Sequence, residues 1–472
     1  MEAQIPVFAI VGHPNKGKSS IVSTLAQDSS VSISPLSGTT VHCRTYPMQV
    51  DGKELYRLVD TPGFQRARAA MDWMQRHSTS ASDHVEVVRN FVEKQRNHQH
   101  FISECELLTP ILAGAGILYV IDGSIPYGPE YDAEMEILRW TGQPSMALIN
   151  QIGKAEFFEQ WQQPLSQYFK IVRVFNAQTA SFDRQIQLLT GFSELSDDWH
   201  QPLQQAADQL QAQRRQRMNL SARCITEGLV NMLQASETSN LGNKDDQMEI
   251  DKAAEEFQQK LIRMENRMRS EVESYFNYHR LEREEAALGI ASEDLFSERT
   301  WKIFGLSRDQ LVTTGMIGGA AGGSLLDLGS GGLTMFLGSG LGAIIGGASA
   351  WFGAKKLIGT RILGLPMGGH QLVVGPITNL NFPWVLFGRA VTHLQLVSQR
   401  THAMRDQLQI IHSTGSDIVS GIPSAQRREI QRIFTGAAKG HAVKEEELSR
   451  LVEVIVSLVA KNPDSSKRDE SP

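Results

Sequence analysis

Cysteine is scarce in this chain, and the few that are present lie far apart. Among 472 residues there are 3 cysteines, Cys43, Cys105 and Cys224, and none belongs to a C-x-x-C pair. Their number and spacing exclude a disulfide-built scaffold and a thiolate zinc site. They favour a reducing compartment.

A large excess of one charge is also absent. The 46 basic and 52 acidic residues leave a formal net charge of −6. A strongly basic surface for nucleic acid is therefore not indicated. The first strand-like run begins near Ile5 without a charged and apolar leader before it, so we expect a cytoplasmic protein. The length predicts two or three domains.

A complete phosphate-binding loop lies near the N-terminus. Gly12-His13-Pro14-Asn15-Lys16-Gly17-Lys18-Ser19 fits the G-x-x-x-x-G-K-S/T template. The strand-like 7–11 precedes it and the helix-like 20–26 follows it, which is the context that the motif requires. The sequence therefore predicts a nucleoside triphosphate site. The residues expected to contact the nucleotide in this loop are His13, Pro14, Asn15, Lys16, Gly17, Lys18, Ser19 and Ser20.

Two further motifs are typical of a switch nucleotidase. Asp60-Thr61-Pro62-Gly63 follows a strand-like run, so that Asp60 can hold Mg²⁺ through water and the Gly63 N–H can contact a γ-phosphate. In Ser37-Gly38-Thr39-Thr40, Thr40 is favoured over Thr39 as the residue that closes on Mg²⁺, although an ordinary polar loop is the alternative. The predicted metal ligands are Ser19, Thr40 and Asp60, and the predicted catalytic residues are Lys18, Thr40 and Gly63.

These motifs together resemble those of the Era/TrmE branch of small bacterial GTPases, over about the first 180 residues. The sequence outside these motifs, including Glu104–Leu108 and Arg139–Pro144, resembles a bacterial family of such GTPases with a C-terminal domain of unknown function. The resemblance implies a P-loop fold that binds GTP and GDP with Mg²⁺. It also implies that Asn15 can help to place a monovalent cation such as K⁺. Because the residue after the DTPG glycine is the apolar Phe64, it implies slow hydrolysis unless a cation, a partner or a nucleotide-dependent dimer completes the site.

Base recognition departs from the family pattern. The pattern is Asn-Lys-x-Asp after a buried strand, and this chain has Asn150-Gln151-Ile152-Gly153 there. Asn150 is kept as a predicted nucleotide-binding residue, but Gly153 replaces the carboxylate that would accept from the guanine ring. Guanine preference is therefore implied by the resemblance and weakened by the residues present.

A long insertion separates Gly63 from the next strand, at residues about 64–112. It is charged and helix-like, and we expect a solvated helical insertion that moves with the DTPG switch. It carries His77, His84, His98 and His100, which lack acids or cysteines at metal-ligand spacing. Asp122, after the following apolar run, is expected to cap the end of a strand.

Helical periodicity begins near Trp199 and continues through the C-terminal half. An apolar stripe recurs at spacings of three and four, which predicts an amphipathic helix packed in a core. Its members are Phe257, Leu261, Met264, Met268, Val272 and Tyr275. Gln371–Val374 and Trp384–Phe387 are strand-like, and the polar tail 461–472 is expected to be disordered.

A glycine-rich apolar stretch spans residues 311–354, with Asp327 as its one charged residue. Glycines at G-x-x-x-G spacing, such as Gly338/Gly342, predict two close-packed helices. Two environments stay open for this hairpin. It can enter or lie on an inner membrane, or it can be buried within protein.

The chain is thus expected to hold an α/β P-loop domain at 1–195, with a mostly parallel sheet flanked by helices, and a mainly α-helical domain at 196–460. The first functional hypothesis is a GTPase that hydrolyses GTP to GDP and phosphate and so controls its C-terminal domain. The alternative is a nucleotide-binding module with little turnover that regulates membrane or partner association.

Membrane flotation tests the two environments of the glycine-rich hairpin. If residues 311–354 enter lipid, the full chain should float with liposomes and a variant lacking 311–354 should not. If neither protein floats, in any nucleotide state, the hairpin is buried in protein.

Overall fold

The computed structural model describes most of the chain in two compact units. The described residues are 5–27, 42–151, 157–241, 247–276, 295, 355–357, 361–362, 365–366, 370–377, 379–400, 418–419 and 421–460. Met1–Arg215 form the bulk of the first unit and Gln216–Ser398 the bulk of the second. The boundary lies inside the long helix α8 (Asp197–Gln234), whereas the sequence places it at 195.

The first unit is built on a six-stranded sheet in the order β2-β3-β1-β4-β5-β6. Only β2 runs antiparallel, against β3, and the other neighbours pair in parallel. The strands are β1 (Val7–Val11), β2 (Arg44–Val50), β3 (Lys53–Asp60), β4 (Gly116–Asp122), β5 (Ser145–Asn150) and β6 (Ile171–Phe175). The strand predicted at 7–11 is confirmed to the residue. β1, β3 and β5 run in the same direction, so their C-terminal ends lie along the same edge of the sheet.

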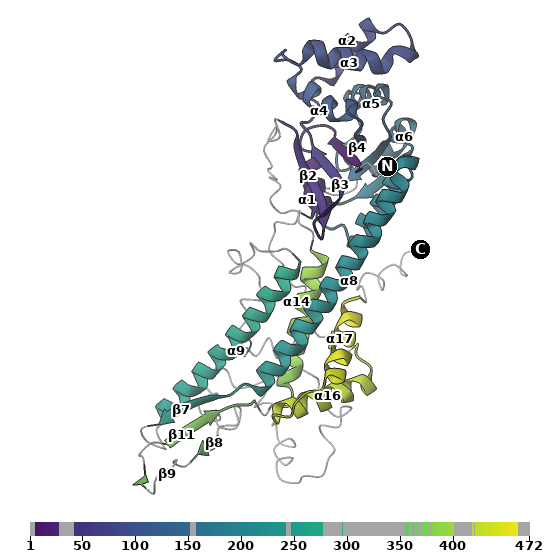
Figure 1. The fold of residues 1–472 in the computed structure, drawn as a ribbon. Helices are drawn as coiled ribbons and strands as arrows, with labels where there is room; N and C mark the ends of the chain where they lie inside the picture. Colours follow the sequence, from purple (N-terminus) through teal and green to yellow (C-terminus); the bar gives the residue numbers. More distant parts are fainter. Residues whose placement is uncertain are drawn as a thin grey trace. The chain divides into compact units, whose positions relative to one another are not determined.

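Helices cover both faces of this sheet (Figure 1). One face carries α1 (Lys18–Ala26), α7 (Phe182–Ser193) and the first half of α8. The other carries α4 (Ile102–Leu112), α5 (Glu130–Trp140) and α6 (Phe158–Tyr168). Alternation along β1 sends Ala9 to one core and Phe8 to the other, as the period of a strand requires. Phe8 stacks on Phe192, with ring centroids 4.1 Å apart.

The segment after Gly63 is helical. It comprises α2 (Ala67–His77), the short 3₁₀ turn η1 (Ala81–Asp83), α3 (His84–Gln95) and α4. Its histidines are partly engaged with aromatic rings, since His77 stacks on Trp73 and His84 on Trp140, at 3.8 and 3.6 Å between centroids. Asp122 caps the end of β4 as predicted, because its Oδ1 accepts from the backbone N–H of Ser124 at 3.0 Å.

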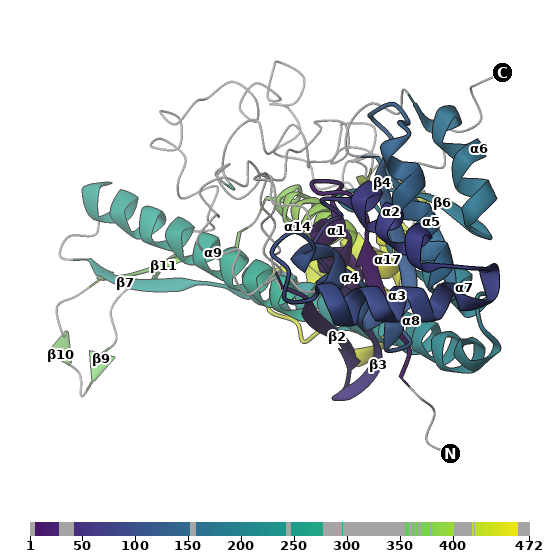
Figure 2. The same ribbon diagram turned by 90° about the horizontal axis from the view of Figure 1, so that it is seen from above.

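The second unit is mainly helical, with one three-stranded and one two-stranded antiparallel sheet among its described residues. Its helices are the second half of α8, α9 (Gln247–Tyr275), α14 (Phe382–Gln399), α16 (Ser424–Ala438) and α17 (Glu445–Ala460). Its strands are β7 (Glu237–Leu241), β8 (Lys355–Leu357), β9 (Arg361–Ile362), β10 (Leu365–Pro366) and β11 (His370–Val374). β11 pairs with both β7 and β8, and β7 and β11 run side by side in Figure 2.

Two expectations for this unit have different outcomes. The apolar stripe on α9 is confirmed as core, since Phe257, Leu261 and Val272 are buried. The strand predicted at 384–387 is wrong, because these residues lie inside α14. α14 is buried on nearly all sides. A short apolar run within a buried helix has no 3.6-residue polar periodicity, and therefore resembles a buried strand.

Charged side chains are buried between α9 and α14. Glu265 accepts from Arg269 Nη2 at 2.8 Å and from Arg389 Nε at 2.7 Å, and all three are at least 95 % buried. Burial alone would raise the pKa of Glu265, but the two guanidinium groups outweigh it and hold that pKa below its usual value. One turn beyond Arg389 on α14, His393 Nε2 lies 2.9 Å from Glu273 Oε1.

The glycine-rich hairpin predicted at 311–354, like the tail at 461–472, lies outside the described residues. Within the part of the chain that the structure describes, no helix has both the length and the hydropathy needed to cross a bilayer.

Removing Glu265 should destabilise the second unit strongly. Glu265→Ala leaves Arg269 and Arg389 buried without this carboxylate, which should cost about 3–5 kcal/mol in the free energy of unfolding. The matched control is Glu256→Ala on the same helix, where the exposed pair Lys252–Glu256 is separated by 3.9 Å. It should cost less than about 1 kcal/mol. Urea denaturation followed by circular dichroism compares them, and equal costs would contradict the buried network.

Candidate functional site: a phosphate-binding loop and its switch turn

The phosphate loop connects β1 to α1 at the edge of the sheet. Its backbone takes up conformations that suit glycine, with φ of 139° at Gly12 and 78° at Gly17, the N-cap of α1. A Cβ at Gly12 would lie 2.3 Å from the Val120 carbonyl oxygen, so a side chain does not fit there. Asn15 also has a positive φ, 61°, and its side chain is exposed. The loop is therefore folded so that the chain turns directly into the N-terminus of α1, a site that favours anions.

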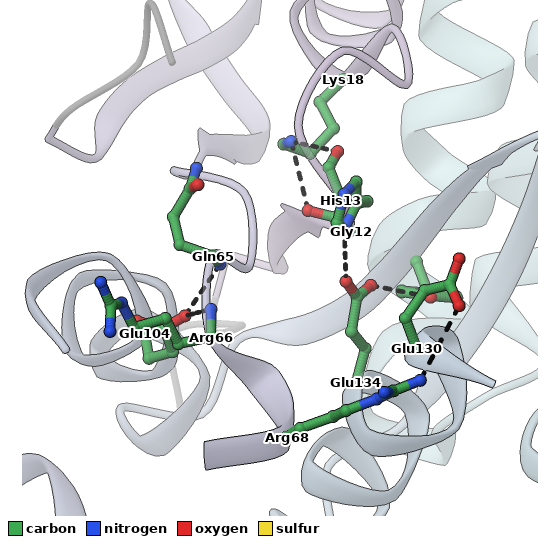
Figure 3. Close-up of polar contacts among 10 residues, drawn as sticks. Gly12, His13, Lys18, Gln65, Arg66, Arg68, Glu104, Glu130 and Glu134 are labelled. Atoms are coloured by element: carbon green, nitrogen blue, oxygen red, sulfur yellow. Dashed lines mark hydrogen bonds and ion pairs between the residues drawn. The ribbon is translucent and has the colours of Figure 1, made fainter. Parts of the chain in front are cut away.

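Lys18 is buried at the start of α1. Its Nζ donates to the carbonyl oxygens of Gly12 at 3.3 Å and His13 at 3.0 Å (Figure 3). Burial lowers the pKa of Lys18 to about 8, against the opposing effect of Asp60. The ammonium is thus held within its own loop, where phosphate oxygens could replace the two carbonyls as acceptors.

Ser19 and Asp60 meet next to this lysine. Ser19 Oγ donates to Asp60 Oδ2 at 2.8 Å, although the two residues belong to different motifs. Asp60 ends β3 and is 3 % exposed. A hydroxyl and a carboxylate oxygen are the hard ligands that Mg²⁺ prefers, so the pair fits a magnesium site. Thr40, the third predicted ligand, lies outside the described residues.

The turn after Asp60 is packed against the phosphate loop. Thr61 Oγ1 donates to the Ile10 carbonyl at 2.7 Å, and the Phe64 N–H donates to the Gly12 carbonyl at 3.2 Å. A Cβ at Gly63 would lie 2.6 Å from Pro14 N, so only glycine permits this approach. The Gly63 backbone therefore lies against the loop that is expected to bind the phosphates.

Two buried carboxylates support these segments, and the sequence did not single out either for this role. Glu104 on α4 accepts through Oε1 from the backbone N–H groups of Gln65 at 2.8 Å and Arg66 at 2.6 Å. Glu134 on α5 lies 2.9 Å from His13 Nδ1. Burial raises the pKa of Glu134, with opposition from His13. A glutamate inside an apolar helix face, as in Glu104-Cys105-Glu106-Leu107-Leu108, is the one signal that could have identified the first.

The Asn150 side chain contacts the backbone of two loops, the phosphate loop and the loop after β6. Its Nδ2 donates to the Lys16 carbonyl at 3.0 Å, and its Oδ1 accepts from the Ala177 N–H at 3.5 Å. Ala177 is itself fixed, since its carbonyl accepts from Thr24 Oγ1 at 2.7 Å. Asn150 thus joins the phosphate loop to the loop after β6. Gly153, where the family pattern has a carboxylate, lies outside the described residues.

The remaining predicted residues lie around the same loop. His13, Pro14, Lys16 and Ser20 are partly exposed there, beside Gly17 and Ser19. Burial lowers the pKa of Lys16, although Asp122 and Glu134 act in the opposite direction. The structure therefore brings together Lys18, Ser19, Asp60 and Gly63, and Asn150 contacts the same loop at the Lys16 carbonyl.

Two sequence models of protein families match the chain. Residues 7–150 match the model described as "50S ribosome-binding GTPase", and residues 162–455 match the "Domain of unknown function (DUF3482)". The predicted resemblance to Era-like GTPases with a C-terminal domain of unknown function is confirmed.

Curated relatives match over the N-terminal region. The GTPase Der of Agathobacter rectalis is 38 % identical over 87 residues, which are 18 % of this chain and 20 % of the relative. The GTPase Der of Paraburkholderia phymatum is 26 % identical over 145 residues, or 31 % and 26 % of the two chains. The chain therefore spans about a fifth of the length of the first of these relatives.

Solved structures of Era are similar to part of the chain. An Era variant from Aquifex aeolicus bound to GDP and aluminium fluoride is 16 % identical, with a TM-score of 0.28 over 50 % of this chain and 72 % of that one. Era in complex with MgGDPNP and a 16S ribosomal RNA fragment is 20 % identical, with a TM-score of 0.25 over 37 % and 52 %.

The pH dependence of nucleotide binding should report on Lys18. Anionic phosphates bind the protonated amine, and its pKa of about 8 means that the charge is lost as the pH rises above 8. Triphosphate affinity should therefore decrease above pH 8, by up to about ten-fold per pH unit.

Lys18→Ala should weaken triphosphate binding by about a hundred-fold or more and remove this pH dependence, while the fold stays intact. Fluorescence titration with a labelled nucleotide from pH 7 to 9.5 measures both effects. The control is Lys53→Ala, an exposed lysine on β3. Wild-type affinity in the Lys18 variant would show that the phosphates bind elsewhere.

Proposed function

We propose that this chain, which belongs to the family defined by the domain of unknown function DUF3482 and carries a GTPase domain at residues 7–150, is a GTP-hydrolysing switch. The observation that carries the proposal is the contact between Ser19 and Asp60, 2.8 Å apart beside Lys18. It joins the phosphate loop to the DTPG turn, and these are the two segments that a nucleotide switch must connect.

Each predicted residue has a role in this proposal. Lys18 and the backbone N–H groups of the loop from His13 to Ser20, apart from Pro14, which has none, hold the phosphates. Ser19 and Asp60, together with Thr40, hold Mg²⁺, which when bound neutralises charge on the β- and γ-phosphates. The Gly63 N–H contacts the γ-phosphate, so loss of that phosphate releases the turn. Asn15 would help to place K⁺ beside the phosphates.

Guanine is the proposed base, with weak discrimination. Asn150 positions the loop at Asn176–Ala177 and the phosphate loop, but its amide is occupied by backbone groups on both sides. Gly153 supplies no carboxylate for the guanine donors. The selectivity for GTP over ATP should therefore be lower than a full Asn-Lys-x-Asp motif gives.

The alternative function is a nucleotide-binding module with little turnover. The observation that favours it is Phe64, which is 1 % exposed and packs into the core, so its side chain cannot orient a water. In either case the output would be a change in the C-terminal domain that alters its association with a protein partner, a membrane or a second copy of the chain.

Phosphate release separates the two functions. With Mg²⁺ present, the wild-type chain should release phosphate from GTP slowly, and exchanging Na⁺ for K⁺ should accelerate it if Asn15 places a cation. Turnover at background in both salts, with nucleotide still bound, would support the alternative instead.

Competition of GTP, ATP and XTP against a labelled nucleotide should show a modest preference for GTP. The expected ratio over ATP is about ten- to a hundred-fold, because one charged acceptor is missing. Equal affinities would contradict guanine recognition. A preference of many thousand-fold would show that another acceptor replaces the carboxylate.

A further inference from the structure

Phe64 follows the DTPG glycine, at the position where a switch nucleotidase can carry a water-orienting side chain. Its side chain is instead buried in the core. Its ring is 1 % exposed and belongs to the apolar cluster that includes Met71 and Leu108. The next residue, Gln65, has an exposed side chain with both a donor and an acceptor. In Figure 3 that side chain points away from Glu104 and α4.

The backbone at Gln65 is fixed on both sides. The Phe64 N–H donates to the Gly12 carbonyl of the phosphate loop at 3.2 Å. The N–H groups of Gln65 and Arg66 both donate to Glu104 Oε1, at 2.8 and 2.6 Å. The phosphate loop and Glu104 together therefore hold the backbone at Gln65 in a defined position.

Glu104 is an unusual residue to find at this place. It is 0 % exposed, and within the described part of the chain its second oxygen, Oε2, has no hydrogen-bond partner. Such burial opposes folding, since an unsatisfied polar atom away from water is unfavourable. An apolar side chain would pack here without that penalty, so the carboxylate is best explained by what it does for the two amides.

We propose that Gln65 is the catalytic residue that orients the attacking water, and that Glu104 is its positioning residue. The inference rests on the proposed hydrolysis of GTP. The water oxygen forms a bond to the γ-phosphorus, while the bond from that phosphorus to the β–γ bridging oxygen breaks and its electron pair leaves with GDP. The water proton passes to a γ-phosphate oxygen, and inorganic phosphate is released. The Gln65 carboxamide accepts from the water and holds it in line.

Steady-state phosphate release and nucleotide affinity test the assignment of Gln65. Gln65→Ala should lower kcat at least ten-fold and change KM and GDP affinity less than two-fold, because water positioning contributes to the transition state alone. The matched control is Arg66→Ala, the exposed neighbour on the same turn, whose backbone contact with Glu104 is kept. It should retain wild-type kcat.

Glu104 is tested by a double-mutant cycle. Glu104→Ala should lower kcat in the wild-type chain but have no further effect in the Gln65→Ala background, because it acts through Gln65. Glu104→Gln keeps an acceptor for the two amides and should restore most of the activity. The exposed Glu93→Ala, in α3 of the same helical insertion, is the control for a nonspecific effect.

The outcomes separate this inference from the function on which it rests. A wild-type chain that turns over while Gln65→Ala retains its kcat overturns the role of Gln65. An additive loss in the double variant overturns the positioning role of Glu104. A wild-type chain that binds GTP but never releases phosphate overturns the proposed hydrolysis, and the inference with it.

Discussion

The structure of the site depends on one close approach, between the DTPG turn and the phosphate loop. Gly63 lies so near Pro14 that a Cβ would be 2.6 Å from its nitrogen, and Thr61 donates to the Ile10 carbonyl at 2.7 Å. The approach follows from the parallel pairing of β1 with β3, which ends both strands at one edge of the sheet. Ser19 and Asp60 meet because of it, so strand order determines where the metal ligands come together.

Buried carboxylates on the covering helices fix the segments that leave this edge. Glu104 holds the turn after Gly63 through two amides, and Glu134 lies against His13 of the phosphate loop. On the same helix as Glu104, the Glu106 carbonyl accepts from Cys43 Sγ at 3.2 Å, just before β2. The helical insertion is therefore in contact with chain segments on both sides of the nucleotide site. Both segments therefore contact α4 directly.

Much of the first unit could be predicted from the sequence because its motifs are local. The strand at 7–11 was predicted to the residue, and Lys18, Ser19 and Asp60 converge as expected. Glu104 and Glu134 could not be assigned, because Glu104 binds backbone amides 38 and 39 residues away and the contact of Glu134 with His13 spans 121 residues. The second unit was harder. The all-round burial of α14 removed its periodicity, and 384–387 were mistaken for a strand.

The magnesium dependence of triphosphate binding tests the central claim most directly, that the phosphate loop and the DTPG turn form one nucleotide site. Affinity for a non-hydrolysable GTP analogue should increase at least ten-fold on addition of Mg²⁺ in the wild-type chain and by less than about two-fold in Asp60→Asn, because Asp60 supplies the carboxylate. An equal magnesium effect in both proteins would contradict the account.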